Sequence, residues 1–226
     1  MNAAKFITQA RKALNKNNVY VSGGFGVLLK GSQLKRYTSN NVYNKEHADE
    51  IVEAAKTQPC YGFDCIGLIK AILWGWDATT GTYGGAVYKS NSVPDANPNT
   101  FFKKYCTDRG AISTDIVPGS MLWSDGHAAI YIGHGLAIES TQKSGNIRYV
   151  HPNGCGTEIK NVPNRTFEKW GTISFVSYQD MDGDSVYIDQ NGNFLEVVED
   201  SFHYLNAGAP AIAFPLTIDM VTYVIK

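Results

Sequence analysis

The sequence predicts an α+β fold in which N-terminal helices pack on a central antiparallel β-sheet. Two helical patterns come first: residues 3–15 are amphipathic, and residues 65–75 are apolar on nearly every side. From residue 120 the apolar residues recur instead with a period of two, and turn signals rich in Gly and Asn separate the runs. Helices followed by an antiparallel meander are typical of the α+β class.

The first part of the chain carries the helical elements. Residues 30–60 are polar and Asn-rich, which indicates an insertion on the surface instead of a core element, and residues 77–100 have the Gly, Asn and Pro content of a loop. The patterns predict one short strand at 19–21 and helices at 3–15, 45–56, 65–75 and 99–107.

The second part carries the sheet. Short turn sequences such as Asp125-Gly126 and Ser144-Gly145 bound the apolar runs. The predicted strands are 120–123, 127–132, 136–141, 147–151 and 172–178.

Composition bounds the function. The chain has 226 residues and a formal net charge of -1, which gives no electrostatic reason to expect a nucleic-acid partner. No stretch approaches the roughly 20 apolar residues of a membrane span, and no secretory signal is recognisable near residue 1. The four cysteines lack zinc spacing, so we expect neither a metal nor a cofactor.

The composition shifts after Tyr178, so we expect a catalytic domain at 1–178 and a small appendage at 179–226. Asp180, Asp182 and Asp184 begin like a calcium loop, but Ser185 and Asn191 replace its Gly and Glu, which favours a turn. A hairpin is expected around Asn191-Gly192. The apolar end, residues 205–225, suits attachment through self-assembly or to virion proteins.

Cys65 lies at the predicted start of the apolar helix, directly after Asp64. A helix N-terminus lowers the pKa of a thiol and offers N–H groups to an oxyanion. Cys65 is therefore a candidate nucleophile. An isolated Cys is more commonly a small buried hydrophobe, and Asp64 is also compatible with a simple N-cap.

His127 opens a predicted strand straight after Gly126, where an imidazole can reach a neighbouring helix and act as general base. A solvated turn histidine is the alternative. Glu139 interrupts an apolar strand. If residues 133–135 form a three-residue loop, Ile132 pairs with Leu136 and Glu139 shares a face with His127, whereas a two-residue turn would place it on the other face.

These segments together resemble the NlpC-type cell-wall cysteine peptidases, which are papain-like and related to the CHAP amidases. The resemblance rests on Asp64-Cys65-Ile66-Gly67-Leu68, on Gly126-His127 with Ile130-Tyr131-Ile132-Gly133, and on Tyr20-Val21-Ser22-Gly23-Gly24. It implies Cys65 as nucleophile, His127 as base and Glu139 as third catalytic residue. It also implies that Tyr20, Asp64 and Gly126 bind substrate.

Two departures from the family pattern bear on specificity. Ile66 stands where many members carry a Ser that helps Asp to hold a free substrate amine, so the cut next to D-glutamate is not implied. Residues 28–58 also lengthen the link between Gly24 and Asp64, and could reshape or cover the cleft.

The resemblance implies a peptidoglycan hydrolase, either a stem-peptide endopeptidase or an N-acetylmuramoyl-L-alanine amidase. Without a signal, such an enzyme reaches the wall by lysis or on a phage particle, so a phage lysin or tail-associated lysin is expected. The alternatives are a catalytically silent virion or wall-binding module and a papain-like thiol acyltransferase.

Overall fold

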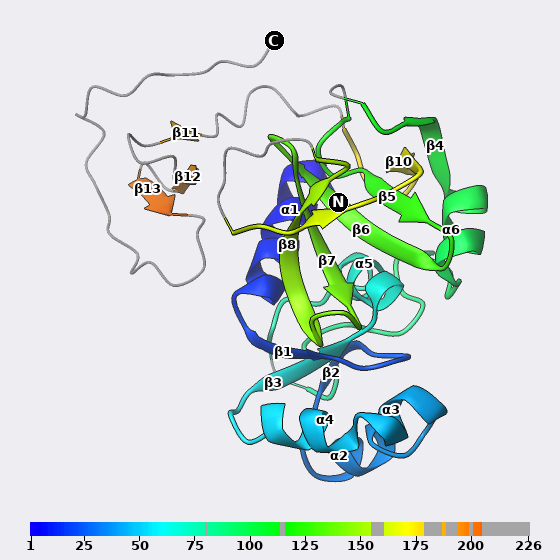
Figure 1. Ribbon diagram of the computed structural model, residues 1–226, viewed down its shortest axis with the longest axis vertical. Coiled ribbons are helices and arrows are strands. Elements are labelled where there is room, and N and C mark those ends of the chain that lie inside the picture. The colour runs from blue at the N-terminus through cyan, green and yellow to red at the C-terminus, as the bar shows by residue number, and fades with distance from the viewer. Residues whose placement is uncertain are drawn as a thin grey trace.

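The computed structural model describes residues 1–79, 81–113, 116–154 and 161–178, and the backbone of three later strands. The fold is α+β, as predicted (Figure 1). The helices are α1 (Ala3–Leu14), α2 (Gly31–Tyr37), α3 (Val42–Glu46), α4 (Ala48–Ala54), α5 (Cys65–Leu73) and α6 (Pro98–Tyr105). The strands are β1 (Asn17–Tyr20), β2 (Phe25–Leu28), β3 (Cys60–Phe63), β4 (Cys106–Ala111), β5 (Met121–Ser124), β6 (His127–Gly133), β7 (Leu136–Thr141), β8 (Asn146–Pro152), β9 (Asn164–Arg165), β10 (Lys169–Ile173), β11 (Tyr187–Ile188), β12 (Phe194–Val198) and β13 (Ser201–Tyr204).

A seven-stranded sheet with the order β4-β10-β5-β6-β7-β8-β9 forms the centre of the molecule. Its pairs are antiparallel except β8 with β9, which are parallel. Helices α1 and α5 pack against each other and against β6 and β7. All nine residues of α5 are buried, which explains why its sequence is apolar on nearly every side.

A smaller sheet, β1-β3-β2, lies between the large sheet and the helices α2, α3 and α4 (Figure 1). The sequence predicted one surface helix at 45–56. The structure instead has α4 in this range, preceded by α3, which ends at Glu46 because the backbone of His47 leaves the helical region. Tyr37 and Ile51 are buried with residues of β1, β2 and β3, so the prediction that 30–60 contributes nothing to a core is wrong.

Two predicted boundaries are wrong as well. The helix expected at 99–107 ends at Tyr105, because Cys106 turns extended and opens β4, which pairs with β10. The strand expected at 172–178 is β10 at Lys169–Ile173, and residues 174–176 form a turn. Phe175 and Val176 continue the apolar pattern because they pack on the core from that turn.

Ser177 and Tyr178, the last residues of the continuously described part of the chain, are attached to its core. Ser177 pairs with Asn2 beside the start of α1, and the Tyr178 hydroxyl donates to the Gly119 carbonyl. Beyond it, β11, β12 and β13 form a separate antiparallel sheet, with β12 in the centre. The expected turns at 180–184 and at Asn191-Gly192, and the apolar end at 205–225, lie outside the described residues.

No helix in the described part of the chain combines the length and apolar character needed to cross a membrane. Nor do the described His, Cys, Asp and Glu side chains gather in any group of three or more that could hold a metal ion.

Candidate active site

Cys65 is the first residue of α5, and Asp64 caps that helix. The extended backbone of Asp64 turns its carboxylate back, so that Oδ1 accepts the Gly67 N–H at 2.5 Å. Its Oδ2 accepts the Gly23 N–H at 2.9 Å, which ties the start of α5 to the turn after β1. Burial raises the pKa of Asp64, against the opposing effects of the Lys70 charge and these two N–H groups.

Gly67 allows α5 to lie directly on that same turn. A Cβ at position 67 would meet the Gly24 carbonyl oxygen at 1.8 Å, so only glycine fits. This close approach brings β1 and the start of α5 together, and Tyr20 and Cys65 line a common cleft. Burial, followed by the nearby Cys65 and Asp64, raises the pKa of the Tyr20 hydroxyl, which is therefore a neutral donor at ordinary pH.

The Cys65 thiol is buried, and its Sγ lies 3.8 Å from the Gly126 carbonyl oxygen. Burial and then the Asp64 carboxylate raise the pKa of the thiol to about 12, although the N–H groups of Ala128, Ile66 and Cys65 favour the charged form. The expectation that the helix N-terminus leaves a lowered thiol pKa is therefore wrong. Its N–H groups act in the expected direction, but burial outweighs them.

His127 opens β6 after a tight turn that α6 holds in place. Gly126 has a φ of 70°, a backbone conformation that glycine adopts readily. Asn99 of α6 accepts the Gly126 N–H at 2.9 Å and donates to the Asp125 carboxylate at 2.7 Å. Asn99 thus holds both Asp125 and Gly126, the two turn residues that precede His127.

The hairpin between β6 and β7 places Glu139 beside His127, but by a different route from the predicted one. Gly133, not Ile132, pairs with Leu136, so the loop is the two-residue His134-Gly135. A bulge between Tyr131 and Gly133 then shifts the register, and Ile130 pairs with Ile138 as a three-residue loop would have given. The expectation that a two-residue turn sends Glu139 to the opposite face is wrong because the extra residue in β6 compensates.

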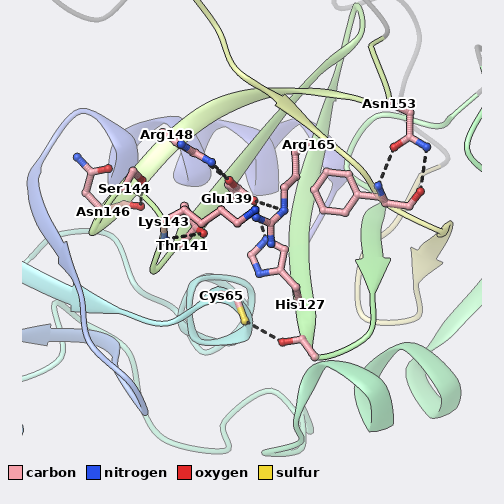
Figure 2. Close-up of polar contacts among 12 residues, drawn as sticks. Cys65, His127, Glu139, Thr141, Lys143, Ser144, Asn146, Arg148, Asn153 and Arg165 are labelled. Atoms are coloured by element: carbon pink, nitrogen blue, oxygen red, sulfur yellow. Dashed lines mark hydrogen bonds and ion pairs between the residues drawn. The ribbon is translucent and has the colours of Figure 1, made fainter. Parts of the chain in front are cut away.

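Glu139 has no exposed surface, and its Oε2 lies 2.6 Å from Nε2 of His127. Burial alone would raise the pKa of Glu139, but the hydrogen bond and charge of His127, with Arg165 and Arg148, hold it below the ordinary value. An ionised carboxylate only accepts hydrogen bonds, so Nε2 carries the proton. Figure 2 shows the imidazole between Glu139 and Cys65, with its other ring nitrogen, Nδ1, directed toward the thiol.

Two further residues, Phe167 and Asn153, help to fix the position of the imidazole ring. The ring of Phe167 stacks on His127 with centroids 6.0 Å apart and an interplanar angle of 16°. Asn153 fixes the Phe167 backbone by accepting its N–H at 2.7 Å and donating to its carbonyl at 2.9 Å (Figure 2). His151 of β8 places its Nδ1 3.1 Å from the Gly135 carbonyl oxygen.

A cleft of about 410 Å³ opens over the thiol. It contains four of the six residues singled out from sequence, while His127 and Glu139 stand behind it. Lys70 and Asp95 form an ion pair at 2.5 Å on its wall. The lining residues are Tyr20, Asp64, Cys65, Ile66, Lys70, Asp95, Ala96, Asn97, Pro98 and Gly126, and none of them belongs to 28–58.

The structure thus brings all six sequence candidates together. Sequence reasoning missed Arg148, Arg165, Asn99 and the Asn153–Phe167 pair. Arg148 had a usable signal, because pairing the two predicted strands across the Ser144-Gly145 turn sets it opposite Glu139, as found. Arg165 follows a long connection after β8, so the register of neighbouring hairpin strands could not predict its position beside Glu139. No protein-family model, curated protein or solved structure matches this chain.

Proposed function

We propose that this chain is a cysteine hydrolase that cleaves amide bonds in the stem peptides of bacterial peptidoglycan, as an endopeptidase or an N-acetylmuramoyl-L-alanine amidase. The observation that carries the proposal is the alignment of Cys65, His127 and Glu139 under an open cleft. A nucleophile, a base and a residue that orients the base are the parts that thiol acyl transfer requires.

The reaction follows from these positions. Nδ1 of His127 takes the thiol proton as Sγ of Cys65 attacks the amide carbon, whose oxygen gains negative charge beside the N–H groups at the start of α5. The imidazolium then protonates the leaving nitrogen, the C–N bond breaks, and a thioester remains. Water attacks the thioester, giving its proton to His127, and the carboxylic acid leaves as the thiol regains a proton.

Peptidoglycan as substrate, and a papain-like NlpC-type fold, are supported by the sequence resemblance. Helix α5 carrying the cysteine against a sheet carrying the histidine is the arrangement that this resemblance implies. The resemblance assigns Tyr20, Asp64 and Gly126 to substrate binding, and all three line the cleft. Both oxygens of Asp64 already accept backbone N–H groups, and Ile66 adds an apolar wall. We therefore favour a substrate other than a stem with a free amine.

A hydrolase of this class works outside the membrane, so we further propose release by lysis or carriage on a phage particle. Residues 179–226 would then serve attachment or assembly.

Zymography on purified bacterial cell walls tests the proposal. The native chain should clear the walls, and Cys65→Ala should abolish clearing with an unchanged circular dichroism spectrum. Cys60→Ala is the matched control, because Cys60 is fully buried outside the cleft and should leave clearing intact. Mass spectrometry of the products distinguishes the two bonds, since an amidase frees the L-alanine amine and an endopeptidase divides the stem.

Walls that bind the chain without releasing any product would favour the silent binding module. Peptides joined to an added amine in place of water would favour the acyltransferase. Either result overturns the proposed hydrolysis.

A further inference from the structure

Glu139 is held by two arginines as well as by His127. Arg148 stands directly opposite Glu139 in the β7–β8 pairing, and its Nε and Nη2 lie 3.0 Å and 2.9 Å from Oε1. Arg165 of β9 places Nε 3.6 Å from Oε2, the oxygen that also contacts His127 (Figure 2). Two fixed positive charges thus flank one negative charge, and the three side chains together carry a net charge of +1.

The two arginines differ in what they contribute. Arg148 occupies Oε1 with two donors, which leaves Oε2 for the imidazole and fixes the plane of the carboxylate. Arg165 is farther away, and its Nη1 is buried without a hydrogen-bond partner among the described residues. Arg165 therefore acts mainly through its charge. The side chains are only 23% and 17% exposed, so solvent screens both charges weakly.

A carboxylate beside an imidazole normally favours the imidazolium, and an imidazolium beside a thiol favours the thiolate. Two guanidinium groups on the same carboxylate oppose this effect. We propose that Arg148 and Arg165 are positioning residues that hold Glu139 against His127 and cancel its charge, so that Cys65 rests as a neutral thiol and gives up its proton only during attack.

The other groups around the thiol act in the same direction. Asp64 at the start of α5 is negative and disfavours a thiolate, and Tyr20 from β1 is a neutral phenol. Lys70 of α5 is neutralised by Asp95 from the loop before α6, and Asp125 of the β5–β6 turn adds negative charge held by Asn99. The raised thiol pKa agrees with this arrangement. Only the attack of the thiol on a substrate rests on the proposed function. The protonation state of the resting thiol is a property of the chain without any substrate.

The rate of Cys65 alkylation by iodoacetamide, followed by peptide mapping between roughly pH 5 and pH 9, tests the proposal without any substrate. The native chain should lose reactivity steadily as the pH falls. Arg165→Met and Arg148→Met should gain an acid plateau, with labelling at about pH 5.5 faster by on the order of tenfold, because Glu139 can then stabilise an imidazolium–thiolate pair. Arg165→Lys keeps the charge and should behave like the native chain, as should the exposed-arginine control Arg36→Met.

An acid plateau in the native chain would overturn the proposal, and this measurement decides the matter even if both Met variants fail to fold. Unchanged pH profiles in folded Met variants would overturn the proposal too. Arginines with a purely structural role would leave the reactivity of the thiol in acid as it is in the native chain. Wall hydrolysis is measured separately. A chain that shows the expected alkylation shifts but leaves walls intact would keep this proposal and lose the proposed function.

Discussion

Burial raises the pKa of all three described cysteine thiols, to about 11 for Cys60 and to about 12 for Cys65 and Cys106. The pKa therefore does not distinguish the reactivity of the three thiols. Access of a reagent does, because only Cys65 among the three lines the cleft. We expect iodoacetamide to label Cys65 in the folded chain at least tenfold faster than the other two, on the order that protection by burial provides. Peptide mapping before and after unfolding in urea measures this, and equal labelling of the folded thiols would contradict it.

Glu139→Gln should reduce turnover by on the order of tenfold or more, because the amide keeps the size of the carboxylate but cannot support an imidazolium. It should also destabilise the fold by about 1–3 kcal/mol, since Arg148 and Arg165, which are partly exposed, lose their charged partner. Glu53→Gln is the matched control, because Glu53 pairs with Lys56 on the surface and should change neither quantity.

The stability difference should depend on pH with a definite sign. The pKa of Glu139 is lowered in the folded chain, so its stabilising contribution is complete above the unfolded value of about 4.3 and is lost as the pH falls through the folded value. Urea unfolding should therefore show a larger gap between the native chain and Glu139→Gln at neutral pH than below about pH 4. A gap that is constant or widens in acid would contradict the charge assignment.

The candidate site was largely predictable because its residues sit at features that sequence reveals. Cys65 marks a helix start, His127 follows a glycine turn, and Glu139 breaks an apolar strand. The sequence did not reveal how burial and charge balance around them. A helix terminus predicts an acidic thiol, yet burial of Cys65, followed by the charge of Asp64, raises the pKa of the thiol. Such balances depend on the solvent excluded by distant segments, which no local pattern encodes.

At the scale of the elements, the glycine in the first turn of α5 has a clear structural role. Replacing a helical glycine by alanine ordinarily stabilises a protein by about 1 kcal/mol. Gly67→Ala should instead destabilise this chain by on the order of 3 kcal/mol, because its Cβ would overlap the Gly24 carbonyl and push α5 off the turn after β1. Chemical denaturation measures the loss, and Cys65 alkylation reports the displaced helix start.

Gly23→Ala provides the comparison. It lies in the same turn, and the space that an alanine Cβ would occupy there has no neighbouring atom within 4 Å, so only its φ of 80° opposes alanine. The expected cost is about 1 kcal/mol. If the two variants were equally stable, the close packing of α5 on the turn would not be the reason for the glycine at position 67.

Elements with strong periodicity were predicted well, and those defined by their partners were not. The amphipathic α1 and the strands β5 to β8 lie close to their predicted ranges. Strands β3 and β4 exist because β1 and β10 pair with them, and the four residues of β3 are all buried. The bulge in β6 is likewise set by the pairing with β7, although it decides on which face Glu139 lies.

At the scale of the whole molecule, the candidate site lies where helix α5 meets the large sheet. Helix α5 carries Cys65, the proposed nucleophile, and the large sheet carries His127, the proposed base, together with Glu139. The insertion at α2, α3 and α4 reaches the cleft only indirectly. Tyr43 of α3 meets Tyr20 edge to face at 5.2 Å, and the buried Asn44 bonds to both backbone groups of Ser22. We infer that the insertion supports Tyr20, which lines one wall of the cleft, and does not cover the Cys65 thiol.

The division of the chain proposed after Tyr178 leads to a prediction about truncation. The residues just before that point belong to the packed core: Phe175 lies against Phe101 and Tyr105, and Val176 is buried in the main cluster. The Tyr178 hydroxyl accepts the Ile173 N–H and donates to Gly119, which fastens the end of β10 to the loop before β5. A chain ending at Tyr178 keeps every one of these contacts.

A chain of residues 1–178 should therefore fold with nearly native stability and keep the fast alkylation of Cys65, while attaching to whole cells or assembling less well. A chain ending at Ser174 should lose about 3 kcal/mol or more, because it removes the buried Val176, the partly buried Phe175 and the Tyr178 bridge. Thermal melting, cell sedimentation and light scattering on both truncations measure these outcomes. If removing 179–226 alone unfolds the protein, those residues are part of the core. The attachment role proposed for them would then fail together with the two-part division of the chain.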